Sequence, residues 1–220
     1  MSFALPSRQD VTGLILAGGL GRRMQDQDKG LLSVRGKTLT QWTQARLAPQ
    51  VGSLGISANR NLDDYQKLGV EVWPDSTQNF EGPLAGMASG LMHCVTPYMA
   101  VVPCDTPCFP VDLVERLSAG LTQADAQLAL ASTTAPDRDQ PRIQPVFCLL
   151  HVSLLPSLQQ FLATGGRKVE QWARQHRLAL VHFDDAEAFA GANTPQELAA
   201  LSQRLASADG WASEVNLNAN

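Results

Sequence analysis

The sequence predicts an α/β protein with a mostly parallel, doubly wound sheet and helices on both of its faces. Two observations support this prediction. Short apolar runs typical of buried strands alternate along the chain with segments typical of helices. A glycine-rich loop with adjacent cations follows the first of these runs, Val11 to Leu16. Strands that alternate with helices pair in parallel, because each crossover helix returns the chain to the same edge of the sheet.

The first half of the chain alternates regularly. Strands are expected over residues 11–17, 52–58, 70–73 and 98–102, and helices over residues 38–47, 62–68, 83–94 and 111–121. Prolines mark several boundaries. Pro49 stops the first helix and Pro74 ends the third strand, while Pro83 takes the first position of its helix, where a missing N–H costs nothing.

The second half of the chain is less regular. Strands are expected over residues 127–131, 143–150 and 178–183, and helices over residues 152–162, 169–174 and 194–205. The last helix has a start signal, with Thr194 as N-cap, Pro195 at the first position and Glu197 at the third. We expect a single domain over residues 1–206 and a flexible tail over residues 207–220.

Composition narrows the class of protein. A chain of 220 residues with 44% hydrophobic and 17% charged residues suits one well-packed soluble domain. Its net charge of −4 offers no basic field for nucleic acid. The sequence has no apolar stretch long enough to cross a membrane and no secretory signal at its N-terminus. We therefore expect a cytoplasmic protein with no nucleic-acid or membrane partner.

The four cysteines form no C-x-x-C pair; they are Cys94, Cys104, Cys108 and Cys148. Cys104 and Cys108 are four residues apart, but no histidine lies near them in the sequence, so the signal for zinc is weak. Reduced, buried thiols of a cytosolic protein are the favoured interpretation.

The glycine-rich loop carries the strongest chemical signal. It reads Leu16-Ala17-Gly18-Gly19-Leu20-Gly21-Arg22-Arg23-Met24, and Lys29 follows. Glycines let the backbone approach a ligand closely, and cations beside exposed N–H groups suit a polyphosphate. A dinucleotide fingerprint is excluded, because Met24 stands where the third glycine belongs. A Walker A loop is also excluded, because the spacing from Gly30 to Gly36 is one residue too long, and Gly36-Lys37 is interpreted as a turn.

Polar groups follow the other strands of the first half. Residues 52–58 lead to Asn59-Arg60, residues 70–73 lead to Asp75, and residues 98–102 lead to Asp105. Ligands of an open parallel sheet bind beyond the carboxyl ends of its strands. We therefore expect these groups and the glycine-rich loop to converge on one edge.

Asp105 is the strongest candidate for a ligand-binding residue among these groups, because Pro103 and Pro107 stiffen the turn around it. A carboxylate opposite a cationic phosphate loop suits Mg²⁺, which bridges to phosphates through one or two carboxylates. The alternative is an aspartate that caps the helix over residues 111–121. Asp75 has a similar place, and an ordinary turn residue is the alternative there.

Two further segments are candidates for ligand contacts. Gly82-Pro83-Leu84-Ala85-Gly86 opens a helix with small residues, which allow a sugar or a base to come close; ordinary helix-start chemistry is the alternative. Gln144 and the turn Gly165-Gly166-Arg167-Lys168 are candidate acceptor contacts, in which the two cations would hold a second phosphate. An exposed loop is the alternative for that turn.

Taken together, these motifs resemble those of the molybdenum cofactor guanylyltransferases of the MobA type. The matching segments are residues 16–24, Asp28-Lys29-Gly30-Leu31-Leu32, Asp75-Ser76, residues 82–86, Cys104-Asp105-Thr106-Pro107 and Asn193-Thr194-Pro195-x-Glu197-Leu198. The resemblance spans about residues 10–205. It implies a Rossmann-like nucleotidyltransferase fold, in which residues 10–122 form the nucleotide-binding half and residues 123–206 the acceptor-side half.

The resemblance also implies a reaction and its partners. Such an enzyme transfers GMP from GTP to the terminal phosphate of the molybdopterin-bound molybdenum cofactor, forming molybdopterin guanine dinucleotide and pyrophosphate. Mg²⁺ is the expected metal, and Mn²⁺ is expected to substitute for it. Transient contact with molybdenum-insertion proteins or recipient molybdoenzymes is a further expectation.

Together with the motifs, the resemblance implies roles for individual residues. The predicted catalytic residues are Arg23, Lys29 and Asp105, with Asp105 as the metal ligand. The predicted nucleotide contacts are Leu16, Ala17, Gly18, Gly19, Lys29, Ser57, Asn59, Asp75, Gly82 and Asp105. The predicted acceptor contacts are Gln144, Arg167, Lys168 and Asn193.

The chain departs from the family pattern at two positions, since Ser57 and Gly191 stand where asparagine is common. Three other functions fit these residues less well. A cytidylyltransferase on the same cofactor is disfavoured by Gly18, because related enzymes with alanine there tend to use cytidine nucleotides. Arg22 and Asp28 argue against a sugar-1-phosphate enzyme. The set of Arg23, Lys29 and Asp105 argues against a non-catalytic nucleotide-binding module.

Overall fold

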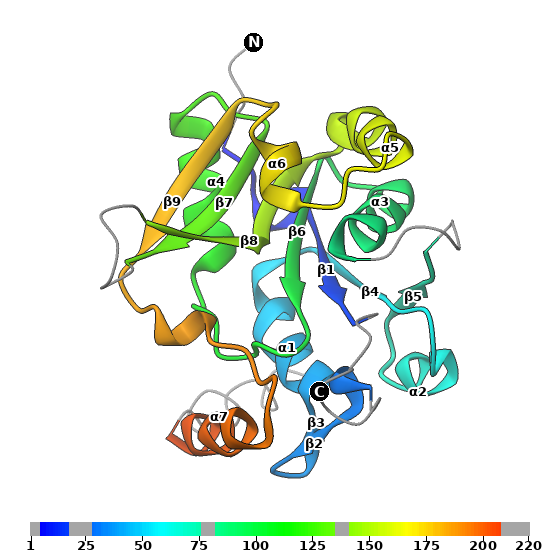
Figure 1. Cartoon of the computed structure of the whole chain (residues 1–220), viewed down its shortest axis with the longest axis vertical. Helices are drawn as coiled ribbons and strands as arrows, with labels where there is room; N and C mark the ends of the chain where they lie inside the picture. Colours follow the sequence, from blue (N-terminus) through cyan, green and yellow to red (C-terminus); the bar gives the residue numbers. More distant parts are fainter. Residues whose placement is uncertain (1–4, 18–27, 76–81, 135–140, 208–220) are drawn as a thin grey trace.

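A computed structural model of the chain describes residues 5–17, 28–75, 82–134 and 141–207 (Figure 1). It confirms the predicted α/β fold with a mostly parallel sheet. Seven strands form this sheet in the order β5-β4-β1-β6-β8-β7-β9. Their bounds are β1 Val11–Leu16, β4 Ser53–Ser57, β5 Glu71–Trp73, β6 Tyr98–Pro103, β7 Leu128–Thr133, β8 Arg142–His151 and β9 Leu178–Phe183. Strands from both halves of the chain share one sheet.

Strand β8 runs antiparallel to both of its neighbours, β6 and β7. The connection from Thr133 to Arg142 explains its direction. A parallel crossover needs about a dozen residues or more, usually with a helix, and this connection is too short for one. The amino end of β8 therefore lies beside the carboxyl end of β7, where Gln144 is paired with Ala131.

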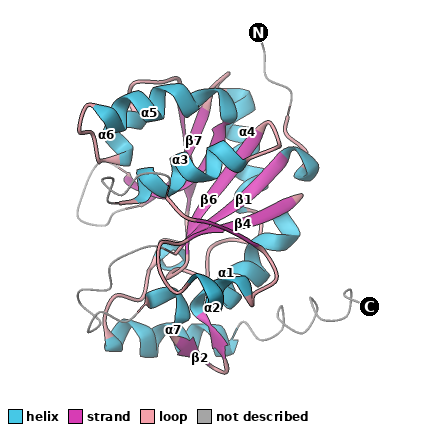
Figure 2. Ribbon diagram, turned by 90° about the vertical axis from the view of Figure 1, so that its right-hand side faces the viewer, coloured by secondary structure: helices cyan, strands magenta, loops and turns pink. Residues whose placement is uncertain are grey.

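Helices cover both faces of the sheet (Figure 2), as predicted. One core contains side chains of α1 (Leu39–Leu47), α2 (Leu62–Gln66) and α4 (Leu113–Gln123). The other contains side chains of α3 (Pro83–His93), α5 (Leu155–Ala163) and α6 (Val169–Ala173). Along β7, Leu128 and Leu130 face the α3 side, whereas Ala129 and Ala131 face the α4 side. Burial on both faces explains why β1, β6 and β7 are apolar runs rather than alternating patterns.

A third, smaller core lies beyond the carboxyl ends of the parallel strands, below the arrowheads of β1 and β6 in Figure 1. It joins the hairpin of β2 (Ser33–Val34) and β3 (Lys37–Thr38) to α1 and α7 (Pro195–Ser207). Val34 and Trp42 pack there against Leu201 and Leu205 of α7. This contact carries the C-terminal helix to the edge of the sheet where the site was predicted.

The hairpin was not predicted, although its turn was. Arg35 and Gly36 occupy the tip with φ of 51° and 81°, so the turn is centred one residue earlier than predicted. Two consecutive residues with positive φ form the turn type that best matches the twist of a two-stranded hairpin. Each strand has two residues, which is too few for a periodic pattern to reveal.

The predicted helix boundaries hold with small corrections. Helix α4 begins at Leu113 rather than at residue 111. The segment from residue 152 begins as the 3-10 helix η4 (Val152–Leu154), before α5. The N-cap prediction at Thr194 is confirmed, because its Oγ1 accepts the N–H of Glu197 at 3.2 Å. The flexible tail was predicted to begin at Ser207, but Ser207 belongs to α7 (Pro195–Ser207); the rest of the predicted tail, residues 208–220, lies outside the described residues.

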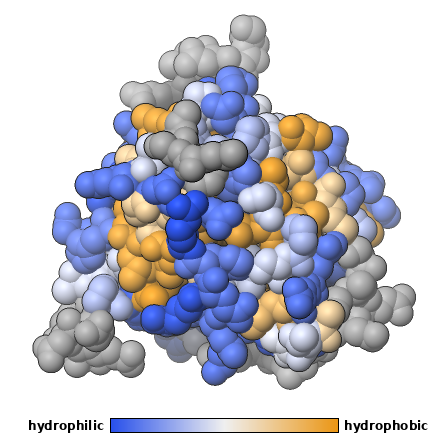
Figure 3. All heavy atoms as spheres, turned by 90° about the horizontal axis from the view of Figure 1, so that it is seen from above, coloured by the Kyte–Doolittle hydropathy of each residue, from blue (hydrophilic) through white to orange (hydrophobic). Residues whose placement is uncertain are grey.

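Figure 3 shows the molecule from above, on the side away from α7 and the β2–β3 hairpin, and hydrophobic and hydrophilic residues are intermingled there. The exposed large apolar side chains of the described residues are Leu5, Met92, Val95, Val111 and Leu180. In the same part of the chain, no helix has the length and apolar character needed to span a membrane. All four cysteines are free thiols, and Cys104 and Cys148 are buried.

Candidate functional site

The end of strand β1 is the centre of the candidate site. Leu16 is paired with Ser57 of β4 on one side and with Pro103 of β6 on the other. The backbone of Ala17 donates to the Ser57 carbonyl at 2.8 Å, and that of Cys104 donates to the Leu16 carbonyl at 3.0 Å. The chain therefore leaves β1 between the polar groups that follow β4 and those that follow β6. Gly18, Gly19 and Arg23, which were predicted here, lie outside the described residues.

Three predicted residues meet at one point on this edge. The Nζ of Lys29 donates to Asp105 Oδ2 at 3.3 Å and to Asn193 Oδ1 at 2.5 Å. The side chains of Lys29 and Asp105 are 20% and 21% exposed, so the ion pair is reachable from solvent but partly desolvated. Partial desolvation strengthens its electrostatic interactions relative to a fully exposed pair. The contact brings together a predicted phosphate ligand, a predicted metal ligand and a predicted acceptor contact.

The turn that follows β6 holds Asp105 in place. Thr106 Oγ1 donates to Asp105 Oδ1 at 3.1 Å, and the Asp105 carbonyl accepts the N–H of Ala192 at 3.0 Å. Asp105 does not cap α4, because Asp112 is the N-cap residue of that helix. Gly191 packs against the same turn: a Cβ there would lie 2.9 Å from Thr106 Oγ1 and 3.3 Å from Asp105 Oδ1. This close approach favours glycine at position 191, where the sequence departs from the pattern of the family that it resembles.

The donor set around Asp105 suits a metal that is held largely by a ligand. Within the described ranges, no three side chains of His, Cys, Asp or Glu gather to form a self-contained metal site. Mg²⁺ bound with phosphates usually keeps several waters and takes only one or two protein carboxylates. The half-buried Asp105 carboxylate, beside a lysine that can hold phosphate, fits this mode of binding.

A second cluster lies on the other side of β1. Asp75 follows β5, and its carboxylate accepts Nδ2 of Asn59 at 2.8 Å and the hydroxyl of Ser57 at 3.4 Å. The N–H of Asp75 donates back to Asn59 Oδ1 at 2.8 Å. Partial burial raises the pKa of the Asp75 carboxyl, while the hydrogen bonds from Asn59 and Ser57 act in the opposite direction. The three predicted nucleotide contacts thus form one hydrogen-bonded unit.

Gly82, another predicted nucleotide contact, is the N-cap residue of α3. Its φ of 105° is a conformation that favours glycine, and a Cβ at this position would meet open space. Pro83 occupies the first turn of the helix, as predicted. Backbone conformation therefore accounts for Gly82 without any ligand, and its contact with a nucleotide stays a prediction.

The predicted acceptor residues are spread over three places. Asn193 lies beside Lys29, and Gln144 lies near the end of β7, where its Nε2 donates to Thr133 Oγ1 at 3.2 Å. Arg167 is exposed, and its described hydrogen bonds go to the carbonyls of Leu162 and Gly166 at 3.1 and 2.7 Å. Lys168 is the exposed N-cap residue of α6. The contacts that join Lys29, Asp105 and Asn193 involve neither of these two cations.

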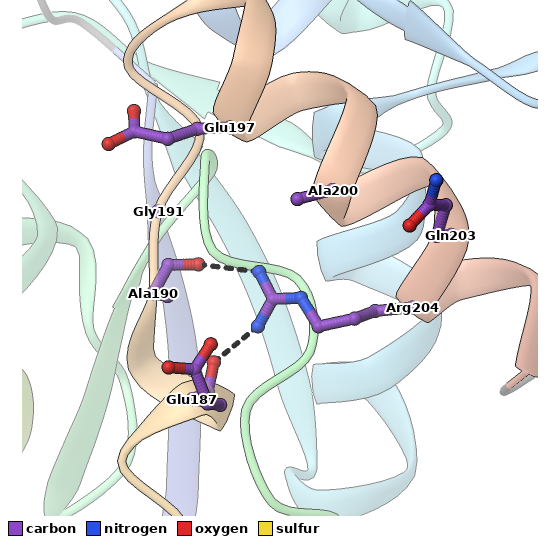
Figure 4. Close-up of a pocket in the computed structure, with 7 residues that line it drawn as sticks. All are labelled: Glu187, Ala190, Gly191, Glu197, Ala200, Gln203 and Arg204. Atoms are coloured by element: carbon purple, nitrogen blue, oxygen red, sulfur yellow. Dashed lines mark hydrogen bonds between the residues drawn. The ribbon is translucent and has the colours of Figure 1, made fainter.

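A cavity of about 440 Å³ opens next to this cluster, between residues 187–191 and helix α7. Figure 4 shows Arg204 reaching from α7 to the opposite wall, where it donates to the carbonyls of Glu187 and Ala190. The remaining lining residues are Gly191, Glu197, Ala200 and Gln203. Gly191 separates the cavity from Asp105, so the two sites share a wall.

One residue of the matching motif, to which the sequence assigned no contact in the site, is held beside Lys29. Asp28, directly before Lys29, is the one charged side chain among the described residues that is buried. It accepts hydrogen bonds from Gly30, Asn61 and Tyr65. The matching motif included Asp28, but its partners are distant in the sequence, so only the folded structure reveals them.

Comparisons with known proteins point to one family. Residues 13–179 match the MobA-like NTP transferase domain. The "Molybdenum cofactor guanylyltransferase" of Bordetella pertussis is 55% identical over 194 residues, which cover 88% of this chain and 98% of that protein. The protein of the same name from Cupriavidus taiwanensis is 53% identical over 198 residues, covering 90% and 99%.

Among solved structures, the fold is similar to that of Molybdopterin-guanine dinucleotide biosynthesis protein A from Archaeoglobus fulgidus. The TM-score is 0.69 at 20% identity, covering 89% of this chain and 99% of that one. At this identity the likeness concerns the fold, and it supports the Rossmann-like nucleotidyltransferase architecture.

Proposed function

Since this chain belongs to the MobA-like NTP transferase family, we propose that it transfers GMP from GTP to the terminal phosphate of the molybdopterin cofactor. In this reaction an oxygen of the acceptor phosphate attacks the α-phosphorus of GTP. The new P–O bond forms as the bond to the β-phosphate oxygen breaks, and pyrophosphate leaves. The product is molybdopterin guanine dinucleotide.

The contact between Lys29 and Asp105 is the observation that supports this proposal best. Both reactants are anions, so bringing their phosphates together is the main electrostatic obstacle. A phosphate monoester is already nucleophilic at neutral pH, and the reaction therefore needs no hydroxyl nucleophile activated by a base. Lys29, with Arg23, would supply fixed positive charge where negative charge gathers in the transition state.

Asp105 would hold Mg²⁺, and Mn²⁺ would substitute for it. A bound Mg²⁺ would neutralise charge on the phosphates and on the leaving pyrophosphate. The chain's own part is to orient the carboxylate, which Thr106 does through its hydrogen bond to Oδ1. Lys29 donates to Oδ2 and would turn to the phosphates of GTP when they bind.

The nucleoside of GTP would lie on the other side of β1. There the carboxylate of Asp75, aligned by Asn59 and Ser57, can accept hydrogen bonds from a ribose hydroxyl or a base N–H. Leu16, Ala17, Gly18, Gly19 and Gly82 would bring backbone groups close to the nucleotide. Residues 10–122 would then form the nucleotide-binding half and residues 123–206 the acceptor-side half.

The acceptor would enter from the side of Asn193 and Gln144. The cavity beside α7 falls in the size range of sites that hold small molecules, and it adjoins the Asp105 turn, so it is our candidate for the bulk of the pterin. Arg167 and Lys168 would add positive charge if the acceptor extends that far. The protein would work in the cytoplasm, with transient contacts to molybdenum-insertion proteins or recipient molybdoenzymes.

The test is pyrophosphate release and product identification with GTP, Mg²⁺ and the molybdopterin acceptor. CTP in place of GTP and a reaction without acceptor are the controls. We expect release only with GTP and acceptor together, with a guanine dinucleotide as product. A preference for CTP would favour a cytidylyltransferase, and tight GTP binding without turnover would favour a binding module; either result overturns the proposal.

A further inference from the structure

The carboxylate of Asp28 is almost completely withdrawn from solvent, with 4% of its side chain exposed. A buried carboxylate is strongly disfavoured unless hydrogen bonds replace its lost hydration. The chain supplies these bonds from three directions, which makes Asp28 a fixed point rather than a surface charge.

Each carboxylate oxygen of Asp28 has its own partners. Oδ1 accepts the hydroxyl of Tyr65 at 2.6 Å and the N–H of Gly30 at 3.1 Å. Oδ2 accepts Nδ2 of Asn61 at 3.0 Å and lies 3.6 Å from Nε of Arg60. We call Asp28, Tyr65 and Asn61 the Asp28 lock.

The partners in the lock are themselves rigid. Tyr65 of α2 is fully buried in the core. Burial is the main cause that raises the pKa of its hydroxyl, and the nearby negative charge of Asp28 adds to it. The hydroxyl therefore stays protonated and acts as a hydrogen-bond donor. Asn61 has a φ of 52°, a left-handed conformation that asparagine tolerates better than most residues. Its backbone thus aims the amide at Asp28 from the loop that follows β4.

The residue after Lys29 is also held. A Cβ on Gly30 would overlap the Tyr65 hydroxyl and lie 2.7 Å from Thr40 Oγ1, so a side chain at this position would displace the lock. Thr40 of α1 donates to the Gly30 carbonyl at 2.9 Å. Asp28 and Gly30 are therefore pinned on both sides of Lys29, which begins the 3-10 helix η2 (Lys29–Leu31).

We propose that the Asp28 lock is the positioning device for Lys29. It fixes the backbone from which the Lys29 side chain reaches Asp105 and Asn193, and Asp28 itself touches no substrate. The loop that follows β4 connects the Asp75 cluster to the Asp28 lock, because its Asn59 donates to Asp75 and its Asn61 donates to Asp28. The kinetic consequence rests on the proposed guanylyl transfer, whereas the effect on Lys29 itself does not.

Three substitutions open the lock, and two of them, Asp28→Asn and Tyr65→Phe, do so with little change in volume. Asp28→Asn replaces one carboxylate oxygen, Oδ1 or Oδ2, by an amide NH2 group. This group is a donor and would face a donor of the lock instead of accepting its hydrogen bond. Tyr65→Phe removes one hydroxyl, and Asn61→Gly removes the amide while glycine keeps the left-handed backbone. The matched control is Thr12→Val, which removes a buried hydroxyl that pairs with Ser53 and Thr96 at the amino end of β1, away from the site.

The first readout is independent of catalysis. The full-length variants are treated with acetic anhydride at one neutral pH, and the acetylation rate of each lysine is measured by mass spectrometry. We expect the Lys29 rate to rise severalfold in the lock variants, toward that of exposed Lys168, and to stay unchanged in Thr12→Val. Unchanged Lys29 labelling in folded Tyr65→Phe and Asn61→Gly would overturn the proposal, even if Asp28→Asn fails to fold.

The second readout is turnover of GTP with the acceptor. By analogy with outer-shell partners of functional ligands, we expect kcat/KM to fall about 10- to 100-fold in Asp28→Asn. The loss should be smaller in Tyr65→Phe and absent in Thr12→Val. If the unmodified chain shows no turnover, the proposed function fails and the labelling result still decides the role of the lock. If the unmodified chain turns over and Asp28→Asn has the same kcat/KM, that role is contradicted.

Discussion

The Nζ of Lys29 lies 3.3 Å from Oδ2 of Asp105, although 76 residues separate them in the chain. Lys29 comes from the segment after β1 and Asp105 from the turn after β6, and these two strands are parallel neighbours in the sheet. Either residue alone has several ordinary explanations. Together they place a cation and a carboxylate where a metal-bound polyphosphate would need both.

Replacing Lys29 tests the cationic side of this pair. Removal of one preorganised charge of this kind costs about 10²–10³ in kcat, and we expect that loss for Lys29→Ala. The measurement is pyrophosphate release at saturating GTP. Lys67→Ala is the control, because Lys67 is exposed and pairs with Asp64 of the same helix segment. Equal rates for the two variants would argue against a role for Lys29.

Replacing Asp105 tests the metal. We expect Asp105→Ala to lose turnover by about 10²–10³ and to weaken the binding of Mn²⁺ to the GTP-loaded protein, which electron paramagnetic resonance can measure. Asp112→Ala, at the start of α4, should leave both quantities unchanged. Near-normal turnover of Asp105→Ala in Mg²⁺ would show that the metal ligand has been wrongly assigned.

The Asp75 cluster predicts how GTP binding depends on pH. Burial raises the pKa of Asp75, so protonation removes the carboxylate acceptor at a higher pH than for an exposed aspartate. GTP affinity should therefore fall as the pH is lowered through this pKa. Asn59→Ala removes a donor that favours the charged form, so the midpoint should move to higher pH.

The control for this titration is Asp75→Asn, in which the Asp75-dependent fall should vanish. A hydrogen bond to a charged group is worth about 1.5–3 kcal/mol, so this variant should bind GTP about 10- to 100-fold more weakly at neutral pH. Isothermal titration calorimetry measures both effects. Superimposable pH profiles for the unmodified chain and Asp75→Asn would exclude Asp75 from the nucleotide site.

Gly191 predicts a steric effect on Asp105. A methyl group there would press on Thr106 Oγ1 at 2.9 Å and on Asp105 Oδ1 at 3.3 Å, so Gly191→Ala should lower kcat more than it lowers the melting temperature. Gly120→Ala inserts a methyl group against Val181, far from the site. This variant should lower the melting temperature more than it lowers kcat. If both variants lose only stability, the turn that holds Asp105 is not sensitive to Gly191.

Much of the fold could be predicted because the central strands β1, β6 and β7 are buried on both faces. A run such as Leu128 to Ala131 is apolar at every position and needs no periodic pattern to be recognised. The same run carries no information about direction, so the antiparallel course of β8 follows only from its short connection with β7. The β2–β3 hairpin escaped prediction because its signal rests on Arg35 and Gly36 alone.

The site was predictable to the extent that its residues follow strands. Asp75 and Asp105 do so directly, and chain order alone places them at the carboxyl edge. The contacts of Asp28 are different in kind, since Asn61 and Tyr65 are 33 and 37 residues away in the sequence. Likewise, Glu197 was expected to complete the helix start at Thr194, but it accepts the N–H of Asn193 at 2.7 Å and so orients the neighbour of Lys29.

A crystal structure of the protein with GTP and Mg²⁺ tests the central assignment most directly. We expect the triphosphate to contact Lys29 Nζ, the metal to bind a carboxylate oxygen of Asp105, and the nucleoside to lie against Asp75. A nucleotide bound elsewhere, or a metal–triphosphate that touches neither Lys29 nor Asp105, would contradict the account.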